Sequence, residues 1–436
     1  MADSADSGLP AAPPARRGRS RVTALLRARP ATRPVPWRRA VPVALAVALL
    51  GALAAAVPAA AAADAPAAAT LTAPAGDAFY DPPNPLPSGS PGDIIWSRTA
   101  TSPVAGADAW QILYLSSTVT GAATAVSGTL IVPTTAYSGT RPVVAYAAGT
   151  QGFGDQCAPS KEIAAGDFDE EFAVNNLLDQ GWAVVITDYP GLGTPGDETY
   201  NISIPEGYAV LDALRAATRL SAAGLSASAP MAIEGYSQGG GAADWAAQLQ
   251  PGYAPELNLE GVAVGGTPAN LQAVADNING TAFFAFLAGT AIGFNAGYPS
   301  LDLSAELTPA GQAAMAGLDT MCQIQALASY AFKSIQDYTV GGVNPMTEPA
   351  WQTVLDANNL GTMKPAVPLL QYHGYLDEVI PYSVETTLHN QYCAMGVKSE
   401  LTGYVGDHVL TQIEAQSQVV SWIGDRFAGV AAPSNC

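Results

Sequence analysis

Uninterrupted apolar runs recur along the middle of the chain, and amphipathic stretches separate them. Such runs are typical of parallel strands that are buried on both faces. Two earlier segments, residues 109–119 and 128–132, have the pattern of an antiparallel pair. We therefore expect an α/β fold, in which residues 101–268 and 366–436 form a mostly parallel sheet flanked by helices. The expected strands are Pro142–Ala147, Trp182–Thr187, Met231–Glu234, Leu259–Val264 and Val367–Gln371, and the helices between them include Glu171–Gln180, Pro205–Ser221 and Gly241–Leu249.

About a hundred residues, 269–365, interrupt this alternation before the last of these strands. Their pattern indicates several helices, and an insertion of this length is too long for a loop in a compact domain. The sequence therefore predicts a helical cap at the carboxyl edge of the sheet. The expected helices are Asn270–Asp276, Phe283–Ala291, Pro309–Ala316, Cys322–Ile335 and Glu348–Asn358.

The N-terminal 63 residues have the pattern of a targeting segment. Nine arginines precede residue 40, an apolar run extends to Val57, and an alanine-rich tract follows. This order is typical of a secretory signal peptide, so residues 1–63 are expected to be removed on export. An uncleaved membrane anchor is the alternative, although an apolar core of about 17 residues is short for a span. Residues 64–100, rich in proline and alanine, are expected to form an arm or linker.

Charge and cysteine content narrow the possible partners. Without the predicted signal peptide the chain keeps nine basic and 35 acidic residues, a formal charge of −26. Such a charge disfavours nucleic acid and anionic membranes as partners. We expect a secreted monomer with no stable membrane insertion after signal removal, and neither metal nor cofactor. Four cysteines in an exported chain predict two disulfides, with three possible pairings. They are Cys157, Cys322, Cys393 and Cys436.

One short segment indicates nucleophilic chemistry. Gly235-Tyr236-Ser237-Gln238-Gly239 has the form G-x-S-x-G, with an expected strand before it and an expected helix after it. This context is typical of a nucleophile elbow, where a tight turn exposes the serine and the glycines allow strand and helix to approach closely. A glycine-rich loop is the alternative in a chain with 43 glycines. We expect Ser237 to be the nucleophile.

A serine nucleophile requires a base and an acid that orients the base. Of the three histidines in the chain, His408 has the expected place, in a late loop after the serine and the acid. Asp377, just after an expected strand, is the predicted acid. Asp407 is less favoured because neighbouring side chains rarely point together. His389 is expected on a helix surface, and His373 in packing or in support of the site.

Two hydrogen-bond donors are needed for the oxyanion of a tetrahedral intermediate. The backbone N–H of Gln238, the residue after the nucleophile, is the first candidate. The second should come from the glycine-rich segment 148–155, in which Thr150 and Gln151 are the candidates.

With these residues assembled, the chain resembles the secretory lipase family, which includes the yeast lipase A type and actinobacterial relatives. The resemblance covers residues 142–436 and places the triad on Ser237, Asp377 and His408. It implies an α/β-hydrolase fold and secreted hydrolysis of acylglycerols and related esters, without metal or cofactor. The motifs that carry it are Gln156–Ser160, Gly235–Ser237, Ala254–Asn258 with Gly265–Pro268, Asp377–Tyr382 and Gln391–Ala394.

The resemblance also implies details of the site. Gln151 stands where the yeast type uses an aspartate side chain in the oxyanion hole, and a neutral amide can donate there. The acyl tunnel would follow the apolar stretch 282–294, although a helix simply buried under the cap is an equal alternative. The implied tunnel residues are Phe283, Phe286, Gly289 and Gly293, and the implied disulfides are Cys157–Cys322 and Cys393–Cys436.

The sequence thus predicts a secreted carboxylic ester hydrolase of the triacylglycerol lipase or carboxylesterase type. It would act on a small-molecule ester or lipid through an acyl-enzyme on Ser237. An acyltransferase or a peptidase with the same triad is the alternative, because specificity resides in the cap. A non-catalytic binding protein of the same fold is a third hypothesis.

Overall fold

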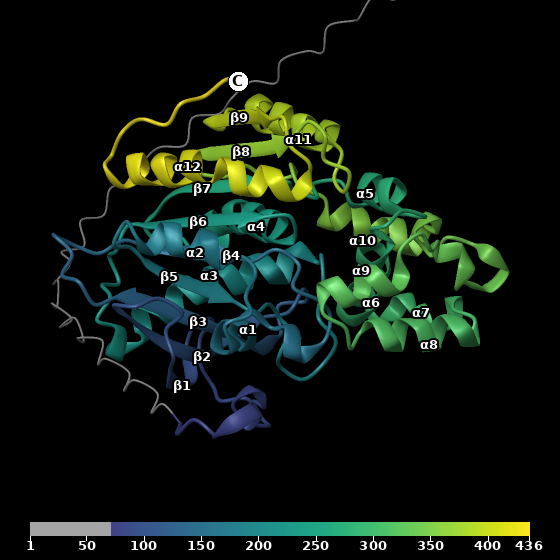
Figure 1. Cartoon of the computed structure of the whole chain (residues 1–436), viewed down its shortest axis with the longest axis horizontal. Helices are drawn as coiled ribbons and strands as arrows, with labels where there is room; N and C mark the ends of the chain where they lie inside the picture. Colours follow the sequence, from purple (N-terminus) through teal and green to yellow (C-terminus); the bar gives the residue numbers. More distant parts are fainter. Residues whose placement is uncertain (1–70) are drawn as a thin grey trace, which may run out of the picture. The chain divides into compact units, whose positions relative to one another are not determined.

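The computed structural model of the protein describes residues 71–436. The predicted signal peptide, residues 1–63, and the start of the predicted arm lie outside these residues. A nine-stranded sheet has the strand order β1-β2-β3-β5-β4-β6-β7-β8-β9 (Figure 1). The strands are β1 (Ile94–Ala100), β2 (Ala107–Ser117), β3 (Ala123–Pro133), β4 (Val143–Ala147), β5 (Ala183–Thr187), β6 (Met231–Tyr236), β7 (Leu259–Gly265), β8 (Leu369–Gly374) and β9 (Ser399–Tyr404).

The sheet consists of an antiparallel part and a parallel part. β1, β2, β3 and β5 pair antiparallel, whereas β5, β4, β6, β7, β8 and β9 run parallel. The predicted α/β fold with a mostly parallel sheet is therefore confirmed.

Two strands at the sheet edges were not predicted. Residues 94–100, assigned to the N-terminal arm, instead form β1 and pair along β2, and β9 closes the other edge. An edge strand has a neighbour on one side only and needs few apolar residues, so its pattern is weak. In β1, only Ile95 and Trp96 are buried.

Helices cover both faces of this sheet. Alternate residues of a strand point to opposite faces, so each central strand contributes side chains to two cores. Ile233 of β6 joins the core that contains α3 and α4, whereas Ala232 joins the core that contains α2 and α12. No helix within residues 71–436 has the length and apolar character required to cross a bilayer. The helices around the sheet are α1 (Pro159–Ala165), α2 (Glu171–Leu178), α3 (Ser203–Arg219), α4 (Gln238–Tyr253), α11 (Tyr382–Ala394) and α12 (His408–Phe427), with short 3-10 turns η1 (Gly76–Tyr80), η2 (Asp155–Cys157) and η3 (Ser221–Ala223).

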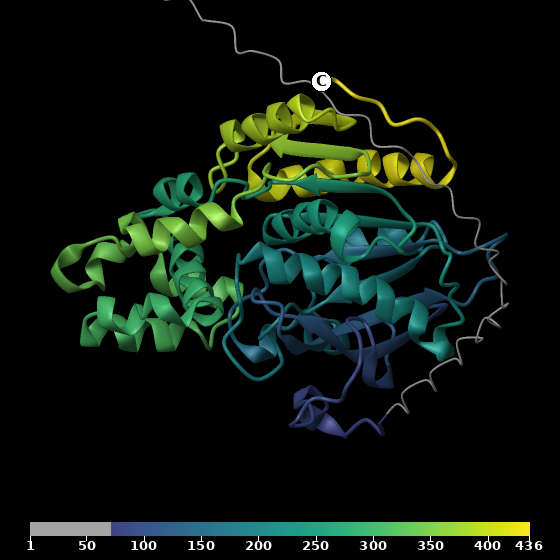
Figure 2. The same ribbon diagram turned by 180° about the vertical axis from the view of Figure 1, so that it is seen from behind.

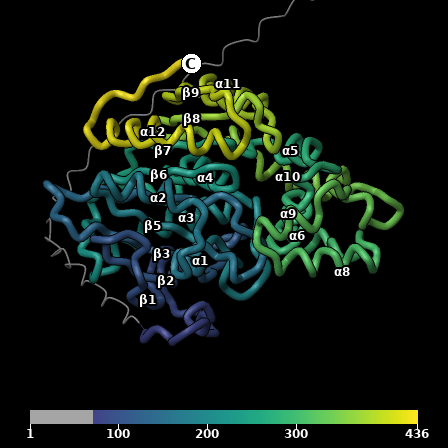
Figure 3. Tube along the Cα trace, in the orientation of Figure 1, coloured from purple at the N-terminus to yellow at the C-terminus, as the bar shows by residue number. Residues whose placement is uncertain are grey.

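The segment between β7 and β8 forms a group of helices beyond the carboxyl ends of the parallel strands (Figures 1 and 2). Figure 3 shows the chain leaving the sheet after β7 and returning at β8. We call this group the cap. It contains α5 (Leu271–Ile278), α6 (Phe284–Gly297), α7 (Leu303–Glu306), α8 (Pro309–Leu318), α9 (Gln323–Tyr330) and α10 (Pro349–Asn358), with η4 (Pro299–Leu301), η5 (Ile335–Asp337), η6 (Val340–Gly342) and η7 (Pro345–Thr347).

Two disulfides have the pairing that the resemblance implies. Cys157 joins Cys322 across 165 residues, and Cys393 joins Cys436 across 43 residues. The first bond links η2, which follows the loop after β4, to the residue before α9 of the cap. The second attaches the C-terminal residue to α11.

Backbone hydrogen bonds reinforce the link between the cap and the loop after β4. Gln323 N donates to Gln151 O at 2.8 Å, and Phe153 N donates to Met321 O at 2.9 Å. The cap is therefore held to this loop by covalent and hydrogen bonds together.

Several carboxyl groups are buried between the sheet and its helices. Glu234 Oε1 accepts from Gln416 Nε2 at 2.7 Å, and Asp244 Oδ1 accepts from Tyr392 OH at 2.5 Å. Burial raises the pKa of Glu234 and of Asp244 to about 8. Both side chains are therefore protonated in the folded protein at neutral pH.

We expect the free energy of unfolding to fall as the pH rises from about 5 to about 8. A carboxyl that titrates near pH 4 when unfolded and near pH 8 when folded keeps its proton only in the folded state over this window. Each such group then lowers stability by about 1.4 kcal/mol per pH unit. Urea unfolding across this range measures the slope. Glu234→Gln with Asp244→Asn should reduce the slope by about 2.7 kcal/mol per pH unit, and an unchanged slope in the double variant would contradict this explanation.

Candidate active site

Ser237 lies on the tight turn between β6 and α4. Its backbone has φ 56° and ψ −124°, a strained conformation for a residue other than glycine. The flanking glycines have no space for a side chain. A Cβ on Gly235 would lie 2.1 Å from Gly239 O, and a Cβ on Gly239 would lie 1.9 Å from Ala147 O. This is the geometry of a nucleophile elbow.

Hydrogen bonds link the side chains of Ser237, His408 and Asp377, which are far apart in the sequence. His408 Nε2 lies 2.9 Å from Ser237 Oγ, and His408 Nδ1 lies 2.7 Å from Asp377 Oδ2. With the proton on Nδ1, the imidazole donates to Asp377 and its Nε2 can accept from Ser237. The structure therefore brings together the three residues predicted for the triad.

His408 was predicted in a loop, but it is the first residue of α12. Asp407 is the N-cap of this helix and accepts from Leu410 N at 2.8 Å. The Asp407 carboxylate therefore caps the helix, which agrees with the prediction that Asp377 is the better candidate for the acid that orients His408. Tyr236, next to Ser237, donates its hydroxyl to His408 O at 2.6 Å. The backbone of the helix start is therefore tied to the elbow.

The Asp377 carboxylate is fully buried and surrounded by donors. Its Oδ1 accepts from Val379 N at 2.9 Å and from Ile380 N at 2.7 Å. Its Oδ2 lies 3.3 Å from His373 Nε2 in addition to its bond with His408. Burial alone would raise the pKa of Asp377, but hydrogen bonds from the two histidines hold it well below its usual range. Asp377 is therefore ionised at neutral pH.

His373 lies between two buried carboxylates and supports Asp377. Its Nδ1 is 3.2 Å from Glu385 Oε2, and its Nε2 is 2.8 Å from Ile380 O. Burial alone would lower the pKa of His373, but hydrogen bonds to Asp377 and Glu385 raise it to about 10. The ring is therefore a cation that can donate from both nitrogens. This position agrees with the predicted supporting role.

The prediction for His389 was wrong, because its side chain is buried on the inner face of α11. Its Nδ1 lies 3.0 Å from Gln371 Oε1 and 3.1 Å from Ser399 Oγ. Polar partners inside the protein explain why the helix pattern looked exposed. His389 also lies close to the sulfurs of Cys393 and Cys436, but these sulfurs form a disulfide and offer no thiolate to a metal.

The loop after β4, residues 149–154, forms one wall of the site. Gln151 is buried, and its Nε2 donates to Gly149 O at 3.3 Å. The hydroxyl of Thr150 lies 2.7 Å from Tyr200 OH. Gln238 is the first residue of α4, and the first N–H groups of a helix have no partner within it. Both predicted sources of an oxyanion donor therefore border the elbow.

The side chain of Gln238 makes contacts that the sequence did not indicate. Its Nε2 donates to Glu198 Oε1 and to Glu206 Oε1, both at 2.8 Å. Both glutamates are buried. Burial raises the pKa of Glu206 to about 8 and that of Glu198 well above its usual range. The side chain of Gln238, which follows Ser237, is thus held by two acids whose raised pKa values favour the uncharged form.

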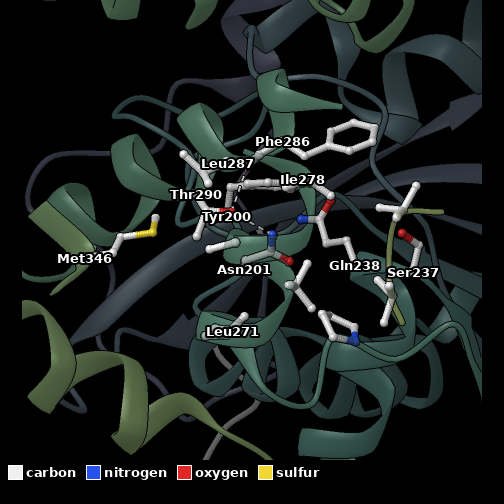
Figure 4. A pocket seen from close by; sticks show the side chains of 15 residues that line it. Tyr200, Asn201, Ser237, Gln238, Leu271, Ile278, Phe286, Leu287, Thr290 and Met346 are labelled. Atoms are coloured by element: carbon white, nitrogen blue, oxygen red, sulfur yellow. Dashed lines mark hydrogen bonds between the residues drawn. The ribbon is translucent and has the colours of Figure 1, made fainter. Parts of the chain in front are cut away.

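A narrow apolar pocket begins beside Ser237 and extends beneath the cap. In Figure 4, Ser237 and Met346 lie at opposite sides of this pocket. The predicted tunnel residue Phe286 is part of its wall. Other wall residues include Leu271, Ile278, Leu287 and Thr290.

Two predicted tunnel residues, Gly289 and Gly293, pack against neighbouring parts of the chain. A Cβ on Gly289 would lie 2.0 Å from the Phe153 ring, and a Cβ on Gly293 would lie 2.5 Å from the Tyr200 backbone. These glycines therefore let the neighbouring chain pack directly against α6, instead of opening a channel. The ring of Phe283 stacks with that of Phe286 at 6.3 Å.

A second, wider pocket lies on the His408 side of Ser237. Gln151, Glu170 and Gln412 contribute polar groups to its wall, and Val409 and Ile413 contribute apolar ones. The two pockets meet at Ser237 and Phe286. The serine is therefore bordered by a narrow space beneath the cap and by a wider one whose wall includes more polar residues.

Comparison with known proteins gives the family. The model of a family described as secretory lipase matches residues 166–435. A secreted triacylglycerol lipase of Malassezia globosa is 31% identical over 387 residues, which cover 83% of this chain and 81% of that protein. Lipase 10 of Candida albicans is 31% identical, with 83% and 82% covered. The chain belongs to the secretory lipase family.

Solved structures agree with this assignment. Candida antarctica lipase A in its closed state has a TM-score of 0.76 and 25% identity, with 84% of this chain and 89% of that chain covered. The rice cell wall degrading esterase LipA from Xanthomonas oryzae has a TM-score of 0.66 at 20% identity, with 79% and 100% covered, and shares the fold. The secretory lipase described here is a secreted carboxylic ester hydrolase with the α/β-hydrolase fold, as predicted.

Sequence reasoning missed several acids that hold the site of this secretory lipase. Glu385 accepts from Gln371 Nε2 at 2.7 Å and from Thr267 N at 3.1 Å, and it also contacts His373. Glu206 lies on the buried face of α3. The sequence did contain a signal for Glu206, namely an acidic residue among apolar positions of a helix. Such a residue indicates a polar partner inside the protein, because a charged side chain is rarely buried without one.

We expect Gly239→Ala to abolish folding or activity in this secretory lipase. The added Cβ would meet the backbone oxygen of Ala147 at 1.9 Å, so β4 and α4 would have to separate. Gly252→Ala is the matched control, because it lies on the same helix and its Cβ would meet nothing within 4 Å. That change should be neutral or stabilise by up to about 1 kcal/mol. Soluble yield, thermal unfolding and ester hydrolysis test both variants, and an active Gly239→Ala enzyme would refute this account.

Proposed function

We propose that this secretory lipase hydrolyses esters through a triad of Ser237, His408 and Asp377. The observation that carries the proposal is the pair of hydrogen bonds of 2.9 and 2.7 Å around the His408 ring. During acylation, Ser237 Oγ bonds to the ester carbonyl carbon and its proton passes to His408 Nε2. The same proton then moves to the alcohol oxygen as the ester C–O bond breaks.

Deacylation repeats the sequence with water. His408 takes a proton from water, the oxygen bonds to the acyl carbon, and the bond to Ser237 Oγ breaks while His408 returns the proton to the serine. Asp377 orients the ring and stabilises the imidazolium. Its ionised state and its bonds from Val379 and Ile380 support this role.

Two backbone segments would bind the oxyanion in the same scheme. The N–H of Gln238 is the first donor, and the second comes from Gln151 or Thr150. Both side chains already have a partner, because the Thr150 hydroxyl contacts Tyr200 OH and Gln151 Nε2 donates to Gly149 O. The Gln151 amide has a second N–H to donate, which favours Gln151 or a main-chain N–H. A glutamine suits this position because its amide NH₂ is a hydrogen-bond donor at any ordinary pH, whereas a carboxylate must first be protonated.

We assign acylglycerols as the substrate class. The relatives from Malassezia globosa are named triacylglycerol lipases, which supports this choice. The apolar pocket beneath the cap suits an acyl chain, since its wall from Leu271 to Leu287 is mostly hydrocarbon. The wider pocket on the His408 side suits the alcohol part of the ester.

Ser237→Ala should lower kcat by about 10⁵-fold, because removal of the nucleophile leaves only binding and oxyanion stabilisation. Asp377→Asn should lower kcat by about 10⁴-fold through the wrong tautomer of His408. A fluorophosphonate should label the unmodified enzyme and spare the Ser237→Ala variant. Ser228→Ala, on an exposed turn before β6, is the control and should behave like the unmodified enzyme. Labelling or full turnover without Ser237 would rule out this nucleophile.

Met346 should set the acyl length that the pocket accepts, because it lies across the pocket from Ser237. Met346→Ala should shift the preferred p-nitrophenyl ester to longer chains. Met346→Trp should lower kcat/KM for palmitate about tenfold and leave acetate nearly unchanged, since each buried CH₂ contributes about 0.8 kcal/mol. Ile324→Ala, exposed on α9, should leave the profile unchanged. Equal changes for acetate and palmitate would exclude this pocket as the acyl site.

A further inference from the structure

Glu170 is a buried acid between two parts of the active site. It directly precedes α2 and is 7% exposed. It also forms part of the wall of the wider pocket, together with Ser237 and His408. Among the hydrogen bonds of residues 71–436, those of Glu170 go to other groups and not to these two residues.

One oxygen of Glu170 fixes the loop after β4. Its Oε2 accepts from Gly149 N at 2.9 Å and from Tyr146 OH at 3.1 Å. Gly149 is the first residue of the loop that contains Thr150 and Gln151. A Cβ on Gly149 would lie 2.6 Å from Glu170 Oε1, so the loop backbone is in close contact with the carboxylate.

The other oxygen fixes the start of α12. Glu170 Oε1 accepts from Gln412 Nε2 at 2.8 Å, and the same amide lies 3.2 Å from Tyr146 OH. Gln412 is four residues after His408, so the two side chains lie on one face of the helix. A single carboxyl group thus connects the loop after β4 to the first turns of α12, the helix that begins with His408.

We propose that Glu170 is a positioning residue, which sets the distance between the loop after β4 and His408. The loop can then bind the carbonyl oxygen of the same ester whose carbon Ser237 attacks with the help of His408. This inference rests on the triad function proposed above. Both oxygens of Glu170 are occupied by donors from the protein, so its role is to accept hydrogen bonds. It transfers no proton to substrate, and it affects catalysis only through Gly149 and Gln412.

Glu170→Met tests this role, because methionine has a similar length and offers no strong acceptor. We expect kcat to fall by about 10- to 100-fold, less than the loss of a whole oxyanion donor. KM should change by less than about threefold, since the loop would act mainly on the transition state. Glu170→Gln should stay within about threefold of the unmodified kcat. Its amide oxygen can accept from Gly149 and Tyr146, and its NH₂ can donate to Gln412 after that amide rotates.

Glu234→Met is the matched control. Glu234 is also buried, and it also accepts from a glutamine of α12, Gln416, one turn beyond Gln412. It has no bond to the loop after β4. We expect Glu234→Met to lower the free energy of unfolding as much as Glu170→Met does, and to leave kcat within about threefold.

The outcomes separate this inference from the triad proposal. Failure of a fluorophosphonate to label Ser237 in the unmodified enzyme would overturn the proposed function. If the unmodified enzyme is labelled and Glu170→Met keeps its kcat, the positioning role alone is overturned. An equal loss of kcat in Glu234→Met would assign the effect to general packing of α12. An equal loss in Glu170→Gln would assign it to charge, and either result would refute the role.

Discussion

The close approach of three backbone segments at Ser237 is the constraint on which the rest of the site depends. β6, α4 and the end of β4 meet at distances that exclude a Cβ on Gly235 or Gly239. This contact holds Ser237 in its strained conformation and puts the N–H of Gln238 at the free start of a helix. It also brings the loop after β4 against the elbow. The candidate triad residues Ser237, Asp377 and His408, from distant parts of the chain, meet at this point.

The central fold could be predicted because buried parallel strands and amphipathic helices leave strong local patterns. β4 to β8 were recognised on that basis. The edge strands β1 and β9 were not, since an edge strand has few buried positions and little hydrophobic signal. The start of α12 at His408 was also missed. Asp407 caps this helix, but an aspartate after Gly406 is equally compatible with a loop, so the boundary between loop and helix was not evident from the sequence.

The candidate triad could be predicted for a different reason, namely scarcity. With three histidines and one elbow, chain order left few arrangements. The supporting groups could not be found in this way, because their roles depend on tertiary contacts. Glu385 and Glu170 are ordinary acids in the sequence. The packing role of Gly289 was also hidden, because the Phe153 ring that lies against it comes from 136 positions earlier in the chain. Spacing along one helix cannot show which distant side chain occupies the space beside a glycine.

Buried acids paired with glutamine amides are a recurring feature of this protein. Glu170 with Gln412, Glu234 with Gln416, and Glu385 with Gln371 all follow this pattern. A buried carboxyl normally requires a cation or loses its charge, and this chain has about half as many basic as acidic residues. An amide can donate to a carboxylate or accept from a carboxylic acid, so these bonds can survive a change in protonation. Asp377 is the exception, because two histidines and two backbone N–H groups keep it ionised. The acid of the candidate triad is thus held in its charged form by His373, a cation that also contacts Glu385, and by the backbone of its own loop.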